Sequence, residues 1–375
     1  MPTLLTTALS LYLAWAAALS DSLFHRVWSI ALFLFSLLTA AIFNSPVSVS
    51  TVPLAVLDLL VFALCIALSP AQLLLHPAKT VDQKDKALDI LFPKSDEDKI
   101  ESLFTDIVAA HGLASNPKTA WESRYKSQSG DKAAPTNKPM WLQDFLPEEE
   151  LNARIMAFNH NTSWEAYALS KLLHDLGDDL LQELRNTRQT VEEQTRPIIF
   201  IGHSFGGLII KQALVNASAD SADDFCRNIR KRACGFIFLG TPHKGAHLTI
   251  QGRLKSLFGF WKGSSTNLLE IIGPGSDLNQ ELHNSFMKYL QTGPGTRNTV
   301  CVFEAVKESI WGMPITHVVE KESAVIDGSH KIGVEKTHRN IQRFDSRSDK
   351  NYQNILTWIK GWANKAKENA LGKCR

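Results

Sequence analysis

The chain has 375 residues, 44% of them hydrophobic and 21% charged, which suits one large domain or a medium domain with an attachment segment. Its formal net charge of +2, without a long basic stripe, argues against nucleic acid as a partner. The five cysteines form no C-x-x-C pair and leave an odd count, which argues against a disulfide-stapled secreted fold and favours a reducing compartment.

Three apolar runs, 4–19, 27–43 and 53–75, stand at the amino terminus, separated by short polar breaks. A helix that crosses a membrane needs roughly 17–25 mostly apolar residues. The second and third runs reach that length and the first is borderline. We therefore expect residues 1–76 to form a hydrophobic membrane anchor of two or three helices whose orientation is open.

Two other interpretations of these runs stay open. The first run could be the apolar part of a signal peptide, but no Lys or Arg precedes Arg26 to form the usual positive region. Alternatively, the runs are buried helices of a helical subdomain. Asp58 within the third run would be costly if it faced lipid, which suggests that it has a partner or an interfacial position. A linker is expected over 77–99.

From residue 100 onward, short apolar strands alternate with amphipathic helices. Strands are predicted over 103–112, 151–161, 197–202, 234–240, 298–306 and 315–320, and helices over 164–189, from Phe205 onward and over about 350–366. Repeated strand–helix units indicate an α/β domain, with a mostly parallel sheet and helices on both faces, over 100–366. Residues 367–375 are expected to form a tail.

Two stretches interrupt this alternation. Residues 115–139 are polar and rich in Pro, Gly and Ser, which predicts a mobile surface insertion. Residues 245–297 contain helical segments broken by Gly and Pro. Their apolar patch at 257–261 is interpreted either as part of a lid over an acyl-binding cleft or as ordinary helix packing.

The segment from Gly202 to Gly206 reads Gly-His-Ser-Phe-Gly and matches the G-x-S-x-G pattern of a nucleophile elbow. In such an elbow the serine occupies a tight, strained turn from strand to helix, and the flanking residues must be small for the two segments to pass. An apolar strand before and an apolar helix after the pattern provide this context, so Ser204 is the candidate nucleophile.

A serine hydroxyl needs a base and an oriented acid, which follow in the order Ser, acid, His in this type of elbow. His330 and His338 both fall in the predicted loop after the last strand, and His338 is preferred because it directly precedes the last helical region. His317 falls within a predicted strand, where a core or surface role is expected.

Glu304 is the preferred acid because it ends a predicted strand at the position where the acid is expected. Asp327 and Glu335, in the later loop, are the fallbacks. The alternative is that Glu304 is an ordinary surface carboxylate without a catalytic role.

The oxyanion hole needs a backbone N–H from Phe205 and a second from a loop after an early strand. That second donor is predicted to be Leu113 or Ala114.

His111 and His203 are expected to shape the loop and the elbow, and His243 to be structural. The sequence holds no spaced His/Cys/Asp cluster, phosphate loop or dinucleotide fingerprint, so neither a metal nor a cofactor is expected.

Five segments carry a resemblance to a known family. In chain order they read AAHGLASNPKTAW, WLQDFLPEEELNARIMAFNHN, IIFIGHSFGGLIIKQAL, GFIFLGTPHKG and VVEKESAVI followed by KTHRNIQRF. Over roughly residues 100–362 they resemble the lipase-like serine esterase domain of the serine-active-site-containing protein family, in the form known from fungi, where it often precedes a nucleotide-binding signalling module. The resemblance implies an α/β-hydrolase fold, with nucleophile, acid and base at Ser204, Glu304 and His338.

The leading hypothesis is a membrane-anchored serine hydrolase that cleaves a carboxylic ester of a lipid or other acylated molecule through an acyl-enzyme. A thioester or amide substrate would use the same triad. The rival is a catalytically weak or inactive interaction module in signalling or lipid trafficking, which Ala114 and Ser115 favour because relatives usually have Gly or Asn there. The expected location is the membrane of the endoplasmic reticulum or mitochondrion, with the catalytic domain on the cytosolic side.

Overall fold

The computed structural model describes one folded unit. The chain divides between Lys84 and Asp85, and every described residue belongs to the second part. The described residues are 87–94, 103–112, 115, 119–124, 138–160, 173–244, 277–293, 295–310, 313–316 and 319–372. The predicted anchor (1–76), most of the insertion and the apolar patch at 257–261 lie outside them. Among the helices in these ranges, none has the length and apolarity needed to cross a bilayer.

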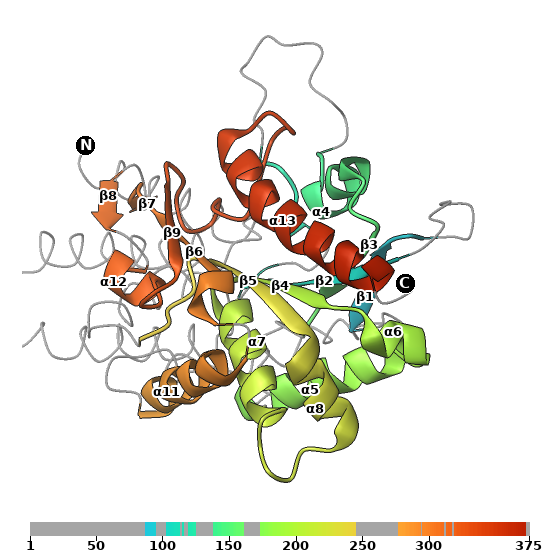
Figure 1. Cartoon of the computed structure of the whole chain (residues 1–375). Helices are drawn as coiled ribbons and strands as arrows, with labels where there is room; N and C mark the ends of the chain where they lie inside the picture. Colours follow the sequence, from blue (N-terminus) through green and yellow to red (C-terminus); the bar gives the residue numbers. More distant parts are fainter. Residues whose placement is uncertain are drawn as a thin grey trace, which may run out of the picture. The chain divides into compact units, whose positions relative to one another are not determined.

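A seven-stranded sheet forms the centre of this unit (Figure 1). In spatial order its strands are β1 (Leu88–Phe92), β3 (Ala153–Phe158), β2 (Thr105–Ala110), β4 (Ile198–His203), β5 (Ala233–Leu239), β6 (Thr299–Glu304) and β9 (His330–Val334). All neighbouring strands pair in parallel except β1, which runs antiparallel to β3 at one edge. The prediction of a mostly parallel sheet is confirmed, and the strand order with its antiparallel edge is that of an α/β-hydrolase.

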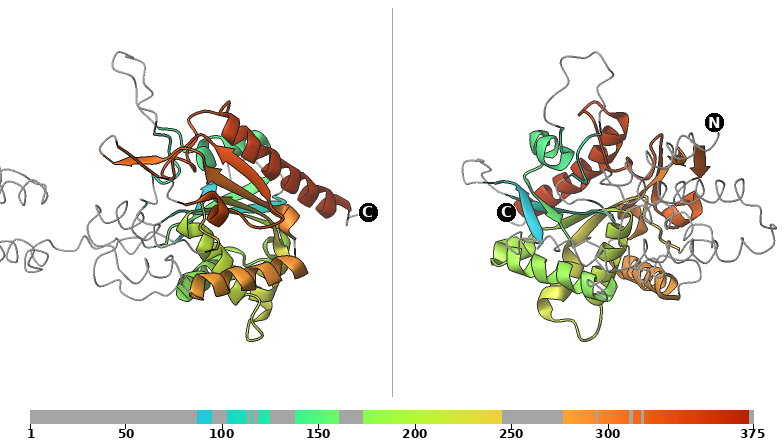
Figure 2. Two further views of the ribbon diagram at one scale, coloured as in Figure 1. Left: turned by 90° about the vertical axis from the view of Figure 1, so that its left-hand side faces the viewer. Right: turned by 180° about the vertical axis from the view of Figure 1, so that it is seen from behind.

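Helices cover both faces of the sheet, as the edge-on view of Figure 2 shows. One face carries α5 (Leu173–Thr187), α7 (Phe205–Asn216), α8 (Asp224–Arg232) and α11 (Asp277–Thr292), and the other carries α4 (Trp141–Asp144) and α13 (Lys350–Gly372). Consecutive strand residues therefore enter different cores: Ile199 and Ile201 pack on the α13 side, whereas Phe200 packs on the α7 side. Strands buried on both faces read as continuous apolar runs, which is why the sequence predicts the central strands well.

Short elements connect the main ones. They are η2 (Leu146–Glu149), α6 (Val191–Thr195), η3 (Thr296–Asn298), the hairpin strands β7 (Glu308–Ile310) and β8 (Met313–Thr316), and α12 (Lys321–Ala324). The predicted strand 315–320 overlaps only with β8, which pairs with β7 outside the main sheet.

Both edge strands differ from the prediction. Residues Leu88–Phe92, assigned above to the linker, form β1, and His330–Val334, assigned to a loop, form β9. Edge strands expose much of their surface, so they lack the long apolar run that marks a central strand. In β9 only Val334 is fully buried, and this explains why its sequence reads as a loop. The closing helix also continues beyond 366, to Gly372.

Candidate active site

Ser204 occupies the turn between β4 and α7 with φ 52° and ψ −120°, a backbone conformation that residues other than glycine rarely adopt. At Gly202 and Gly206 the neighbouring backbone lies so close that no side chain fits. A Cβ atom on Gly206 would lie 2.2 Å from the carbonyl oxygen of Ala110, and one on Gly202 would lie 2.5 Å from the Cα of Gly207. These contacts explain the two glycines of the G-x-S-x-G pattern.

His338 reaches Ser204 from a turn 134 residues further along the chain. Its Nε2 lies 3.0 Å from the Ser204 Oγ, and both side chains are buried. Burial, with a smaller contribution from the charge of Arg339, lowers the pKa of His338 from 6.5 to about 3. The imidazole is therefore neutral near neutral pH and can accept a proton.

Glu304, the last residue of β6, lies behind His338. Its Oε2 is 3.9 Å from Nδ1 of His338, longer than a hydrogen bond, and both side chains are almost fully buried. The other oxygen, Oε1, accepts a hydrogen bond from the backbone N–H of Val319 over 2.6 Å. The structure thus brings Ser204, His338 and Glu304 together in series.

The fallback residues are held elsewhere. Asp327 accepts a hydrogen bond from Lys244 over 3.0 Å, and its side chain is 76% exposed. His330 belongs to the edge strand β9 and packs its ring 4.1 Å from that of Trp358. Glu335 is exposed, and His317 lies outside the described residues.

Of the three predicted oxyanion residues, only Phe205 belongs to the part of the chain that the structure describes. Phe205 is the first residue of α7, where backbone N–H groups of a helix have no intrahelical partner. Leu113 and Ala114 lie outside the described residues. The loop that leads to them begins beside the serine, because a Cβ atom on Gly112 would lie 3.0 Å from the Cβ of Ser204.

Buried histidines surround the elbow. His111 and His160 stack with ring centroids 4.3 Å apart, and Nε2 of His160 donates to the backbone oxygen of His111 over 2.9 Å. Burial lowers the pKa of His111 to about 4 and holds the pKa values of His160 and His203 well below 6.5. Sequence reasoning singled out His111 and His203 but missed His160, since its approach to His111 arises only when β3 pairs with β2.

The loop after β5 is fastened to the elbow helix. Lys211 of α7 is fully buried and donates from Nζ to the backbone oxygen of His243 over 3.4 Å. Burial lowers the pKa of Lys211 to about 7. A Cβ atom on Gly207 would lie 2.1 Å from the hydroxyl of Thr241, so helix and loop are in close contact. His243 is buried within this loop and lies 3.7 Å from the sulfur of Cys301.

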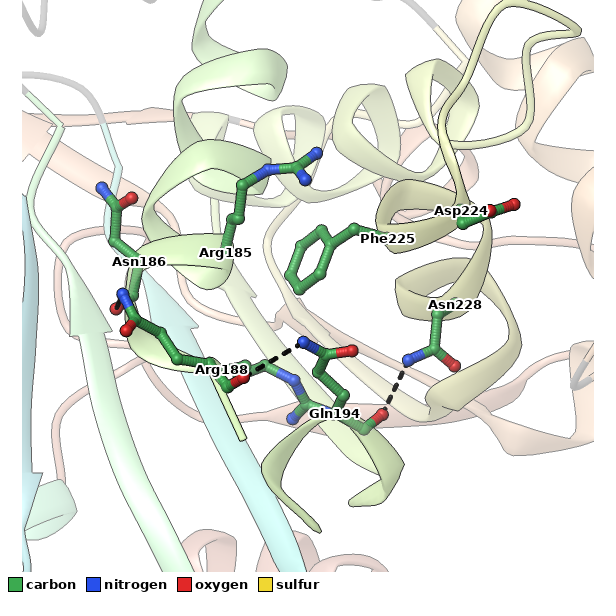
Figure 3. Close-up of a pocket in the computed structure, with 8 residues that line it drawn as sticks. Arg185, Asn186, Arg188, Gln194, Asp224, Phe225 and Asn228 are labelled. Carbon is green, nitrogen blue, oxygen red and sulfur yellow. Dashed lines mark hydrogen bonds between the residues drawn. The ribbon is translucent and has the colours of Figure 1, made fainter. Parts of the chain in front are cut away.

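A pocket with a volume of about 680 Å³ lies away from this cluster (Figure 3). It is lined by Arg185, Asn186, Arg188, Gln189, Gln194, Asp224, Phe225 and Asn228. The residues from α5 and α6 precede the start of β4 at Ile198, whereas Ser204 follows its end. The pocket therefore lies near the amino ends of the strands, whereas Ser204 lies at their carboxyl ends, so the pocket is not part of the candidate active site.

Among the described residues, no group of three or more His, Cys, Asp or Glu side chains is placed to hold a metal ion. Ser204 in the elbow, the buried imidazole of His338 and the carboxylate of Glu304 behind it are described groups that could take part in a reaction.

Comparisons with known proteins bear on the family and the fold of this chain. The model of the family described as "Putative serine esterase (DUF676)" matches residues 107–291. Protein SERAC1 of Bos taurus is 24% identical over 285 residues, covering 70% of this chain and 40% of that protein, and Protein SERAC1 of Homo sapiens is 24% identical over 287 residues with the same coverage. The chain thus spans about 40% of the length of these relatives.

Two solved structures are similar at low identity. Mature Bacillus licheniformis lipase BlEst2 has a TM-score of 0.39 at 15% identity, covering 68% of this chain and 91% of that one. Pyrococcus furiosus esterase PF2001 has a TM-score of 0.39 at 13% identity, covering 70% and 84%. The sheet topology, the family match and the similarity to the curated relatives together support a serine esterase-like domain with the α/β-hydrolase fold.

Proposed function

We propose that this protein is a serine hydrolase that cleaves carboxylic esters through an acyl-enzyme, with Ser204 as nucleophile, His338 as base and Glu304 as the orienting acid. The observation that carries the proposal is the contact of 3.0 Å between Ser204 Oγ and His338 Nε2 at a strained elbow, with a buried carboxylate behind the imidazole.

In the proposed reaction, Ser204 Oγ attacks the acyl carbon while His338 takes its proton, and the carbonyl oxygen becomes an oxyanion. The backbone N–H of Phe205, together with that of Leu113 or Ala114, stabilises this charge. His338 then returns the proton to the leaving alcohol, which leaves an acyl-Ser204 ester, and a water activated by the same imidazole hydrolyses it. Glu304 stabilises the imidazolium that forms in both halves of the reaction.

The proposed substrate is an ester of a lipid or another acylated molecule, presented at a membrane. The apolar runs within residues 1–76 support this, because an anchor there would keep the domain at a lipid surface. We propose the endoplasmic reticulum or mitochondrion as the location, with the catalytic domain facing the cytosol. The same triad would also act on a thioester or an amide, since it reacts at the acyl carbon whatever the leaving group.

A fluorophosphonate probe tests the proposal, because it forms an adduct only with an activated serine. In the full chain, we expect labelling at Ser204 and turnover of p-nitrophenyl esters. Ser204→Ala should abolish both, whereas Ser221→Ala, which alters an exposed serine, should change neither. A folded wild-type protein that forms no Ser204 adduct would contradict the proposal and support the non-catalytic interaction module.

A further inference from the structure

We propose that His203, the residue before the nucleophile, is a positioning residue. Through its hydrogen bond to the backbone of His338, it keeps the imidazole of His338 within hydrogen-bonding distance of Ser204. This inference rests on the proposed function. It assigns His203 a defined role that the G-x-S-x-G pattern, which accepts any residue at this place, leaves unspecified.

The contact joins a rigid element to an irregular one. His203 is the last residue of β4, in the middle of the sheet, whereas His338 lies in a turn that belongs to neither a strand nor a helix. Nε2 of His203 lies 3.0 Å from the backbone oxygen of His338, and the two rings lie 5.3 Å apart. Because Ser204 directly follows His203, one side chain connects the position of the nucleophile to that of the base.

The direction of this hydrogen bond fixes the tautomer of His203. A carbonyl oxygen can only accept, so Nε2 of His203 must carry the hydrogen. Burial, followed by the proximity of His338, holds the pKa of His203 well below 6.5, so the ring is neutral and its Nδ1 is without a hydrogen. The donor is therefore present at every pH at which the enzyme would work.

The other nitrogen of the His203 ring faces Gly112. A Cβ atom on Gly112 would lie 2.9 Å from Nδ1 of His203, so the backbone of Gly112 packs closely on the imidazole. His203 thus lies between Gly112, which directly precedes the predicted oxyanion residues, and the turn that carries the base. The His203 nitrogen that could accept a proton is Nδ1, and it faces Gly112, whereas the Oγ of Ser204 lies 3.0 Å from Nε2 of His338.

Loss of this bond should loosen the turn and let water reach His338. The ionisable groups around that imidazole are Glu304 on β6, His203 on β4 and Arg339 in its own turn. Burial is the main cause of the low pKa of His338, so access of water should raise that pKa toward 6.5. Misplacement of the base should lower kcat with little effect on KM, because substrate binding does not need the imidazole.

Two amide variants of the full chain test the inference. The amide nitrogen of His203→Gln reaches about as far as Nε2 of histidine, whereas His203→Asn is one methylene shorter and falls short of the His338 carbonyl. We expect kcat on p-nitrophenyl butyrate to fall on the order of 10- to 100-fold in His203→Asn, with KM within about twofold, and to recover most of that loss in His203→Gln. His243→Asn, which shortens another buried imidazole, is the matched control, and thermal melting reports whether each variant is folded.

The titration of His338, followed by NMR of ¹⁵N-labelled histidines, provides a readout that does not depend on turnover. We expect its pKa to be higher in His203→Asn than in the wild type and His203→Gln. Equal kcat losses in the Gln and Asn variants, an equal loss in His243→Asn, or an unchanged titration of His338 in His203→Asn would overturn the inference. A wild-type protein that neither labels nor turns over would contradict the proposed function instead, and the NMR titration would still decide the role of His203.

Discussion

Both ends of the sheet bury ionisable side chains, but these side chains are mainly charged and paired at one end and mainly neutral imidazoles at the other. At the amino ends of the strands, Asp106 forms buried ion pairs with Arg154 and Arg188, and Arg154 also pairs with Glu193 over 2.7 Å. At the carboxyl ends, the buried groups around Ser204 are mainly imidazoles, whose pKa values burial lowers far enough to keep them neutral.

This difference distinguishes buried groups that stabilise the fold from buried groups that can take part in a reaction. A buried ionised carboxylate needs opposite charges or hydrogen bonds around it, and at Asp106 the charges come from Arg154 and Arg188, so we expect this cluster to tolerate little change of protonation or partner. A buried neutral imidazole costs much less, and it can take up a proton when a reaction supplies a nearby negative charge. We therefore expect changes at the amino ends to affect folding and changes at the carboxyl ends to affect chemistry.

The strongest test of this separation is Ser204→Ala. It should lower kcat about 1,000-fold or more, because the nucleophile is lost, while the free energy of unfolding changes by less than about 1 kcal/mol. Ester turnover and urea denaturation measure the two quantities. A large loss of stability would show that the carboxyl-end cluster is itself structural.

Asp106→Asn should have the reverse effect. Removal of the carboxylate leaves Arg154 and Arg188 buried beside a neutral amide, so the free energy of unfolding should fall by about 3–5 kcal/mol. Glu192→Gln is the control, because its ion pair with Arg196 is 71% exposed on the carboxylate side and should contribute less than about 1 kcal/mol. Equal urea midpoints for the two variants would contradict the comparison.

Glu304→Gln should lower kcat about 100-fold, because an amide cannot stabilise the imidazolium of His338. The expected change in KM is small. Asp327→Asn, at the exposed fallback position, should leave kcat within about twofold of the wild type, since surface polar changes rarely reach the site. If Asp327→Asn caused the larger loss, the acid would be misassigned.

The last prediction concerns the pH dependence of stability. His338 and His111 have pKa values of about 3 and about 4 in the folded protein and 6.5 when unfolded, so the unfolded state binds more protons between these limits. The free energy of unfolding should therefore fall as pH decreases from about 6.5 toward 4, by about 1.4 kcal/mol per pH unit for each such histidine. Urea denaturation at several pH values measures this slope, and constant stability over that range would show that the histidines are not buried as described.

The sequence by itself determined the α/β class, the central strands and the elbow. Strands β2, β4, β5 and β6 are buried on both faces, so their apolar runs stand out whatever the tertiary context. The elbow is equally visible, because the close contacts of Gly202 and Gly206 leave no room for side chains and so dictate a readable local pattern.

Only the tertiary structure defined the edge strands and brought the residues of the candidate site together, because neither follows from the pattern of neighbouring residues. The edge strands β1 and β9 have few buried side chains, and only their hydrogen bonds to β3 and β6 define them. Among the late histidines, His338 lies beside Ser204 because the turn after β9 carries it there across 134 residues. The position of Glu304 behind that ring and the bond from His203 to its backbone arise in the same way, since contacts between distant segments depend on how the sheet is assembled.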